Sequence, residues 1–531
     1  MKLLNMFFRS GQTALFLNKK DRVFKRLESY FKSYCEIEDD KDFIDDSTWK
    51  DLIMDEIYKK VDYTCSTAGE HVLYDMLRRP LKDGQHLNDR HDNIEFFRKN
   101  EAVRKNAGKI LTKVGRTEID LTATLYSKMA YDWKEHFLCI GLVSLMVAVL
   151  GSFIFIGFSE PVMMLAFMLM MVNMAVHYKL GNKIKNRMLS VQYLGSLVNR
   201  SAGLAKALEG YNPKLSEELR TVGKRCEKIG KKSSVMSAIE GLDVIGDYIT
   251  IIFLIKENSF YSSIGEVEKH KEDLRRLFRI FGEIDGLIAM GQYRENMTGY
   301  CVPEFVAGSR YLEVKEIIHP LLENPISNTM LVKDHSILIT GSNMSGKSTF
   351  LRTIGVNALL AQTVMTCTCK SYKGSIFNIV TSISPEDNIL GGKSYYMSEA
   401  EAIQRIIEAS GSELPCLALI DEIFRGTNPV ERVNAAAEIL EYLENNNGLV
   451  MVATHDLELA KMVENYAYYY FREDVDDKGL VFDYSIKTGI SPTRNAVKLL
   501  GILGYPNQLI DKIEKRIDNL DTTSGSSASV G

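Results

Sequence analysis

The sequence predicts two structural parts, an all-α core domain followed by an α/β domain with a mostly parallel sheet. Two observations predict this division. Apolar residues recur at helical spacing through much of residues 43–298, whereas short apolar strands alternate with helices over residues 299–520. Residues 1–42 are mixed and charged and are expected to form an N-terminal helical segment, and the Ser/Gly-rich residues 521–531 are expected to be disordered.

The composition is that of a large globular protein from a reducing compartment. Its 531 residues suffice for two to four domains, and 65 Lys and Arg against 69 Asp and Glu give a net charge of -4 at pH 7. A protein that mainly wraps nucleic acid is usually basic, so any DNA contact must come from local patches. Eight scattered cysteines do not indicate a disulfide framework. The spacing of Cys367 and Cys369 suits neither a zinc knuckle nor a thioredoxin-type site, which favours buried strand cysteines.

Two long apolar runs interrupt the helical part over residues 137–178. Residues 137–158 carry no charge and as a helix would span about 33 Å, enough for a hydrocarbon core of about 30 Å. The second run covers residues 162–178, and the loop between the runs carries only Glu160, whereas lysines and arginines flank the outer ends. This asymmetry predicts a transmembrane hairpin in the cytoplasmic membrane, with both termini and the α/β domain in the cytoplasm. The alternative is an apolar soluble hairpin buried in a core or in a dimer interface.

A phosphate-binding loop opens the α/β part. An apolar strand, Ser336–Thr340, precedes the sequence G-x-x-x-x-G-K-[ST], and a helix is expected to follow. Backbone N–H groups and a helix N-terminus then bind an anion, while Lys347 reaches the β- and γ-phosphates and the Ser348 hydroxyl holds Mg²⁺. The candidate nucleotide-binding residues are Gly341, Ser342, Asn343, Met344, Ser345, Gly346, Lys347, Ser348 and Thr349.

Two further apolar strands end in residues suited to nucleotide hydrolysis. The strand that begins at Cys416 delivers Asp421 to a position where it can hold Mg²⁺ opposite Ser348. Glu422 is then within reach of a water molecule, as a general base or as a group that orients the water. The other strand, Gly448–Ala453, leads into His455, which can hydrogen-bond the γ-phosphate or the attacking water. A histidine satisfied by the backbone is the alternative for that position.

A second Gly-Lys-Ser sequence, at residues 392–394, precedes another helix and predicts a second anion-binding helix N-terminus. Lys347 and backbone amides already fill the phosphate-binding loop of the same chain. Ser394 is therefore expected to act in trans, on the γ-phosphate bound by the other subunit of a homodimer.

Taken together, these motifs resemble those of the MutS family of DNA mismatch repair ATPases. The loop is similar to the family's G-P-N-M-G-G-K-S-T, residues 392–399 to G-R-S-x-F-x-x-E, residues 421–427 to D-E-I-G-R-G-T, and residues 453–455 to A-T-H. Residues 67–81 are similar to the start of the family's helical core. The resemblance implies an ABC/MutS-like P-loop ATPase domain that binds ATP and Mg²⁺ in a head-to-tail homodimer. It also implies an ATP-driven conformational change on mismatched, damaged or branched DNA.

Several features depart from the family pattern. From the residues before Phe43 and after the ATPase part, the family's N-terminal mismatch-reading and connector domains and its C-terminal nuclease-like domain are not expected. The Phe-x-Glu sequence at Phe281 lies in an expected amphipathic helix, Glu268–Met290, so direct mismatch recognition is not expected. Ile326 stands where the family places an aromatic residue that stacks on adenine.

Two other functions stay open. Leu390 and the two glycines after it resemble part of the signature of ABC transport ATPases, although two spans are few for a transporter. A membrane scaffold without a DNA substrate would fit the near-neutral charge.

Overall fold

The structure is a computed structural model that describes residues 24–238, 243–308, 310–342, 345–383, 395–424, 428–476, 479–490, 504–513 and 515–516. The chain divides into two compact units. One comprises Met1–Asp42, Val61–Met76 and His91–Asn296, and the other Phe43–Lys60, Leu77–Arg90 and Met297–Gly531. Two short stretches of the predicted helical domain thus pack with the C-terminal unit. The domain boundaries given above stay a prediction.

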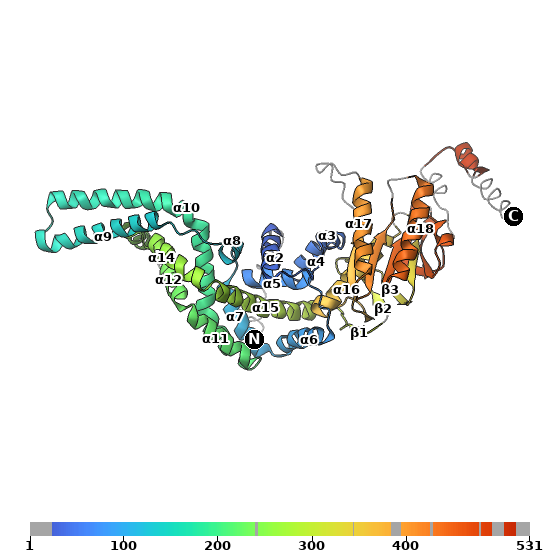
Figure 1. Cartoon of the computed structure of the whole chain (residues 1–531), viewed down its shortest axis with the longest axis horizontal. Helices are drawn as coiled ribbons and strands as arrows, with labels where there is room; N and C mark the ends of the chain where they lie inside the picture. Colours follow the sequence, from blue (N-terminus) through green and yellow to red (C-terminus); the bar gives the residue numbers. More distant parts are fainter. Residues whose placement is uncertain are drawn as a thin grey trace. The chain divides into compact units, whose positions relative to one another are not determined.

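The described residues of the first unit form helices and no strand (Figure 1). The helices, of which α5 and α6 cross the limits between the units, are α2 (Phe24–Glu38), α5 (Thr67–Arg78), α6 (Gly84–Lys99), α7 (Glu101–Val114), α8 (Thr122–Tyr126), α9 (Trp133–Ile156), α10 (Glu160–Ala207), α11 (Pro213–Arg225), α12 (Glu227–Ala238), α13 (Asp243–Ile252), α14 (Ile255–Lys269) and α15 (Lys271–Asn296). The expected helix Glu268–Met290 is wrong at its start. His270, with φ -112°, ends α14, and α15 begins at the next residue.

Helix α15 packs closely against α5 because small residues line their contact. A Cβ atom on Gly282 would lie 2.4 Å from the carbonyl oxygen of Ala68. One turn further along α15, the buried carboxylate of Asp285 accepts hydrogen bonds from the backbone N–H groups of Cys65 and Ser66, at 3.0 and 2.8 Å. These donors directly precede α5, at the end where a helix leaves N–H groups without partners of its own. The two helices are therefore locked in one register.

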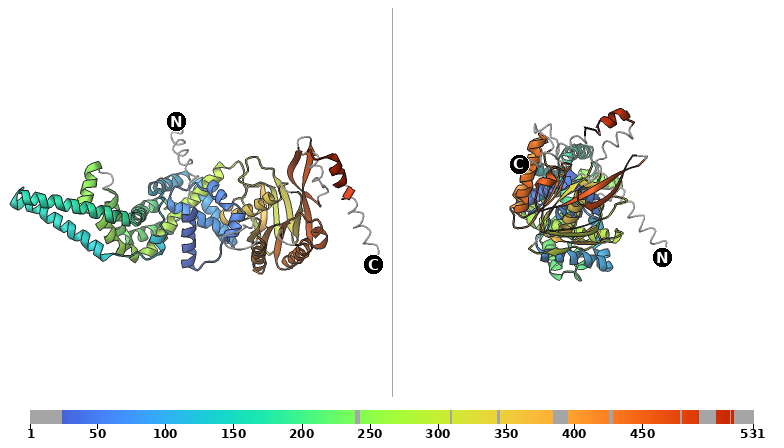
Figure 2. Two further views of the ribbon diagram at one scale, coloured as in Figure 1. Left: turned by 90° about the horizontal axis from the view of Figure 1, so that it is seen from above. Right: turned by 90° about the vertical axis from the view of Figure 1, so that its right-hand side faces the viewer.

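Helices α9 and α10 form the apolar hairpin, and both are long and apolar enough to cross a membrane (Figures 1 and 2). Met146 and Val149 of α9 pack against Leu169 of α10 on the inner side. Away from this contact the apolar side chains are exposed, with Ile154 at 82% and Phe155 at 89%. The apolar run 162–178 is only the first part of α10, which continues without interruption for 48 residues.

The second unit combines helices with two mixed sheets. The strand order is β1-β5-β2-β3 in one sheet and β10-β9-β4-β8-β7-β6 in the other, where every neighbouring pair except β9 and β10 is parallel. The strands are β1 (Glu304–Val306), β2 (Tyr311–Ile317), β3 (Asn328–Lys333), β4 (Ser336–Thr340), β5 (Ser371–Ser375), β6 (Asn378–Ser382), β7 (Cys416–Asp421), β8 (Gly448–Ala453), β9 (Tyr466–Asp476) and β10 (Gly479–Thr488). The helices are α3 (Asp46–Asp51), α4 (Met54–Val61), α16 (Lys347–Val364), α17 (Tyr395–Ser410), α18 (Pro429–Asn445) and α19 (Leu459–Met462). The expected combination of a helical part with a part that contains helices and sheets is thus confirmed.

Helices cover both faces of the larger sheet, which explains why its central strands β4, β7 and β8 are buried at every position and mainly apolar. Ala418 and Ile420 of β7 belong to a buried cluster with α17 and α18. Leu419 points to the opposite face, where it meets Gly355 of α16, and a Cβ atom on that glycine would lie 2.7 Å from Leu419 Cδ1. Helix α16 thus lies close to the sheet, with its first residue, Lys347, at the loop that follows β4.

The short helix α3 packs at the β6 edge of the larger sheet. The buried carboxylate of Asp51 accepts a hydrogen bond from the Thr381 hydroxyl at 2.7 Å and another from the Ile383 N–H at 2.9 Å. These bonds satisfy a backbone group just beyond the last residue of β6, and they attach Phe43–Lys60 to the C-terminal unit.

Candidate functional site

The carboxyl ends of β4, β8 and β7 meet at one edge of the larger sheet. Ala453, the last residue of β8, is paired with Ile339 of β4 on one side and with Asp421, the last residue of β7, on the other. Whatever follows these three strands is therefore brought together, although the segments lie far apart in the sequence. The ends of parallel strands are a frequent place for ligand binding in α/β proteins.

The loop between β4 and α16 is shaped by glycines. Gly341 and Gly346 have φ values of +143° and +107°, which residues with a Cβ atom rarely adopt. The Lys347 ammonium donates hydrogen bonds to the carbonyl oxygens of Gly341 and Ser342, both at 2.8 Å, and so folds back over the loop. The buried Ser345 hydroxyl has no hydrogen-bond partner among the described residues. A phosphate at the N-terminus of α16 would supply one, so these residues fit a phosphate ligand.

Ser348 and Asp421 lie in direct contact. The Ser348 hydroxyl, in the first turn of α16, donates a hydrogen bond of 2.6 Å to Asp421 Oδ2. The Asp421 side chain is almost buried at the end of β7. A hydroxyl and a carboxylate are oxygen ligands of the kind that Mg²⁺ takes beside nucleotide phosphates. The pair therefore fits the predicted metal site.

Glu422 points away from its neighbour Asp421 because its backbone is left-handed, with φ +64°. Its N–H donates to the carbonyl oxygen of Ala453 at 2.9 Å, which holds this conformation. Glu422 Oε1 lies 3.2 Å from His455 Nε2, and the Lys347 Nζ atom lies 3.2 Å from the same ring nitrogen. A left-handed residue that is not glycine costs on the order of 1 kcal/mol and is frequent at functional sites. The turn separates the two consecutive carboxylates, one toward Ser348 and one toward the histidine.

A cavity of about 310 Å³ lies beside the phosphate-binding loop, and the sequence did not predict most of its lining. Ile326 and His319 line it together with Phe471 of β9 and Tyr484 of β10. The Tyr484 ring lies against the loop, since a Cβ atom on Gly346 would be 3.2 Å from its Cδ1 atom. Burial, with nearby positive charges, lowers the pKa of His319 to about 4. The cavity thus offers a neutral, partly aromatic surface next to the phosphate site.

The Tyr484 position depends on an irregularity in the hairpin of β9 and β10. Tyr484 has φ +50°, and the register between the two strands shifts around it. The Asn328 side chain holds the irregularity by donating to the Tyr484 carbonyl oxygen at 3.1 Å and accepting from the Ile486 N–H at 2.8 Å. No local motif signals this contact, because the participating segments are about 155 residues apart in the sequence.

The structure brings Gly341, Ser342, Ser345, Gly346, Lys347, Ser348, Asp421, Glu422 and His455 together in one site. Thr349 follows in the first turn of α16 and lines the cavity. Asn343, Met344 and Ser394 lie outside the described residues. The role of Ser394 in trans therefore stays a prediction.

Comparison with known proteins places this site in a family context. Residues 337–521 match the family model of MutS domain V. The DNA mismatch repair protein MutS of Thermotoga maritima is 28% identical over 287 residues, which cover 51% of this chain and 36% of that protein. The protein of the same name from Clostridium kluyveri is 27% identical over 296 residues, which cover 52% of this chain and 33% of that protein. The one from Thermus aquaticus is 30% identical over 263 residues, which cover 48% of this chain and 31% of that protein. The match spans about a third of these relatives.

Proposed function

This chain is a MutS-family protein, and from this premise we propose that it is a membrane-tethered, dimeric ATPase that couples ATP binding and hydrolysis to a conformational change on DNA. The observation that carries the proposal is the pair of consecutive carboxylates with different partners. Asp421 contacts the Ser348 hydroxyl, and Glu422 approaches His455. A site that binds a nucleotide with its metal and also activates water needs these two groups in separate positions.

Each residue has a distinct task in this proposal. Ser348 and Asp421 would hold Mg²⁺, which when bound supplies positive charge that neutralises the phosphates. Lys347 exchanges the loop carbonyls of Gly341 and Ser342 for phosphate oxygens, so its present hydrogen bonds keep the ammonium in place before the nucleotide arrives. Glu422 accepts a proton from the attacking water or orients that water, and His455 fixes the carboxylate.

The nucleotide base is proposed to enter the cavity beside Gly346. In this chain Ile326 provides an aliphatic wall, and the aromatic surface comes from Tyr484 and Phe471 on the other side. A base can stack on either ring. His319 stays neutral at physiological pH because its pKa is lowered, so it can accept or donate one hydrogen bond to the base without adding charge.

The proposals of a dimer and of a DNA substrate are supported by the family and by the sequence motifs. The relatives carry the name DNA mismatch repair protein, which supports DNA as the partner of the cycle. We propose mismatched, damaged or branched DNA as the substrate class, and a head-to-tail homodimer in which Ser394 completes the site of the other subunit.

The membrane tether rests on helices α9 and α10. Both combine length, high hydropathy and apolar side chains that are not covered within the unit, as at Phe137, Met164 and Phe167, which are 64%, 77% and 62% exposed. Exposed apolar surface of this extent marks a membrane or protein contact. We propose that the hairpin spans the cytoplasmic membrane, with the ATPase part and both termini in the cytoplasm. Extraction from membranes by detergent but not by alkaline carbonate would support this placement, whereas release by carbonate would contradict it.

The experiment that tests the enzymatic proposal is an ATPase assay on the detergent-purified protein. The rate is measured without DNA and with homoduplex, mismatched and branched DNA, beside Lys347→Ala. Stimulation by one DNA form, lost in the variant, is the expected result. Absence of ATP hydrolysis under all conditions would refute the ATPase assignment.

A second function, a membrane scaffold or transport-related ATPase without a DNA substrate, is favoured by one observation. Basic residues of the helical unit that could serve as DNA-binding patches are paired with acidic side chains. Arg225 contacts Asp273 at 2.5 Å, and Arg276 contacts Glu218 at 2.5 Å. A hydrolysis rate that does not respond to any DNA, with no DNA binding at low salt, would favour this alternative.

A further inference from the structure

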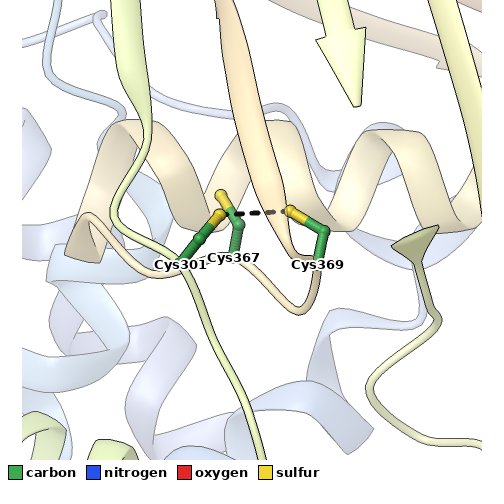
Figure 3. Close-up of side chains that lie close together, drawn as sticks. All are labelled: Cys301, Cys367 and Cys369. Atoms are coloured by element: carbon green, nitrogen blue, oxygen red, sulfur yellow. Dashed lines mark hydrogen bonds between the residues drawn. The ribbon is translucent and has the colours of Figure 1, made fainter. Parts of the chain in front are cut away.

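Three cysteine side chains from two segments of the C-terminal unit converge at one point. Cys301 lies just before β1, and Cys367 and Cys369 lie in the turn between α16 and β5. Figure 3 shows their sulfur atoms close together. Cys301 Sγ is 3.2 Å from Cys369 Sγ, and all three sulfurs lie within 4.8 Å of one another.

The backbone fixes this arrangement. Cys301 and Cys367 form an isolated antiparallel bridge, in which the N–H of each donates to the carbonyl oxygen of the other at 2.9 and 3.0 Å. The next residue, Thr368, is held by Asn357 of α16, whose side-chain oxygen accepts from the Thr368 N–H at 2.7 Å. Both segments that supply the thiols are therefore tied to the core of the unit, and the convergence does not depend on a mobile side chain alone.

We propose that Cys301, Cys367 and Cys369 form a binding site for a thiophilic metal cation, with Zn²⁺ as the first candidate, held by three thiolates with the fourth coordination position open. Tetrahedral zinc with Zn–S bonds of about 2.3 Å places its sulfur ligands about 3.8 Å apart. This value lies between the 3.2 Å of the Cys301–Cys369 pair and the 4.8 Å within which all three sulfurs lie. This inference is independent of the proposed ATPase function.

The number of thiols distinguishes a metal site from a disulfide. A disulfide between Cys301 and Cys369 would join two sulfurs, would need an oxidant, and would leave the Cys367 thiol buried without a role. A thiophilic cation uses all three donors. Cys367 is fully buried, whereas Cys301 is half-buried, so a cation can enter from the Cys301 side.

The position of the site gives it a structural consequence. Cys301 follows the end of α15 by five residues, in the segment through which the chain enters the C-terminal unit. Cys367 and Cys369 follow α16, the helix that begins at Lys347. A bound cation would join this entry segment to the C-terminal end of that helix, and it would stabilise the folded unit because metal binding adds to folding free energy.

The test uses the full chain purified in detergent with a reductant and freed of metal by chelation. Zn²⁺ is titrated into the wild type, into Cys301→Ser and into Cys35→Ser, a matched control in α2, outside the cluster. We expect one Zn²⁺ per wild-type chain, a higher thermal midpoint with Zn²⁺, and a thiolate-to-metal charge-transfer band with Co²⁺. The affinity should fall at least tenfold in Cys301→Ser and stay unchanged in Cys35→Ser.

A measurement on the wild type alone keeps the proposal testable if Cys301→Ser fails to fold. Bound Zn²⁺ should slow alkylation of Cys301 at least tenfold and leave the alkylation of Cys35 unchanged. Two results would overturn the proposal. The first is absence of Zn²⁺ binding by the reduced wild type, including protein in which a Cys301–Cys369 disulfide has first been reduced. The second is binding of Zn²⁺ by folded Cys301→Ser with the same affinity as the wild type.

Discussion

Glu422→Gln removes one charge from the candidate site and keeps the size and backbone preference of the side chain. Glu422 contacts His455 at 3.2 Å, whereas the Ser348 hydroxyl contacts Asp421. The substitution should therefore spare the groups proposed to bind Mg²⁺ and phosphate and remove only the proposed proton acceptor. Loss of a general base lowers a rate by about 10²–10⁴-fold. That range corresponds to about 3–5 kcal/mol in the activation barrier.

The assay measures ATP turnover and ATP affinity separately in the same preparation. We expect turnover by Glu422→Gln to fall by at least about 100-fold. The dissociation constant should change by less than about threefold, because removing a group that acts only in the transition state leaves ground-state binding intact. Glu431→Gln, in the exposed first turn of α18, is the matched control and should behave as wild type. Turnover by Glu422→Gln within threefold of wild type would refute the role of this carboxylate.

Three further predictions follow from packing, burial and the cavity. Gly282→Ala places a Cβ atom 2.4 Å from a backbone oxygen and should destabilise the protein by about 1–3 kcal/mol, whereas Gly265→Ala, with open space around it, should be neutral or stabilising in the same urea titration. Burial lowers the pKa of His71 from 6.5 to about 4, so the unfolded state binds the proton first. The contribution of neutral His71 to the free energy of unfolding is complete above pH 6.5, and about 3 kcal/mol of it is lost as the pH falls to 4. The thermal midpoint of the wild type should therefore fall more steeply between pH 6.5 and 4 than that of His71→Gln; equal slopes would contradict this. Ile326→Phe adds a stacking surface to the cavity and should tighten binding of a fluorescent ATP analogue about twofold to tenfold; weaker binding would show that the base does not enter there.

The sequence predicted the strands that carry the site to the residue, and it did not predict the contacts between distant segments. Strands β4, β7 and β8 are buried, mainly apolar runs because both faces of the sheet are covered, and such runs have clear ends. The approach of Cys301 to Cys369 depends on one antiparallel bridge, and that of Tyr484 to Gly346 on an irregular hairpin. Neither leaves a periodic pattern in the sequence.

The sequence did not predict how far the second helix of the hairpin extends. The change from apolar to charged residues after Tyr178 indicates where the apolar span ends, but helix α10 continues to Ala207. No proline occurs between Val162 and Asn212, and the buried Leu194 and Leu197 keep the later part of α10 packed within the helical unit. A helix continues wherever its backbone hydrogen bonds and its packing continue, whatever the solvent around it.

The continuity of α10 has a mechanical consequence. Its 48 residues form one continuous helix with a path length of about 72 Å, which changes direction between its apolar first part and its later part packed in the first unit (Figure 1). Because no break in the helix separates the two parts, a tilt of the apolar part in a bilayer would exert a torque on the packed part. A change in the tilt of an apolar span costs fractions of a kcal/mol per Å of mismatch with the lipid thickness. If the hairpin spans a membrane as proposed, the thickness of that membrane would enter the energy balance of any motion of the helical unit, and lipid composition becomes a variable to control when the proposed ATP-dependent cycle is measured.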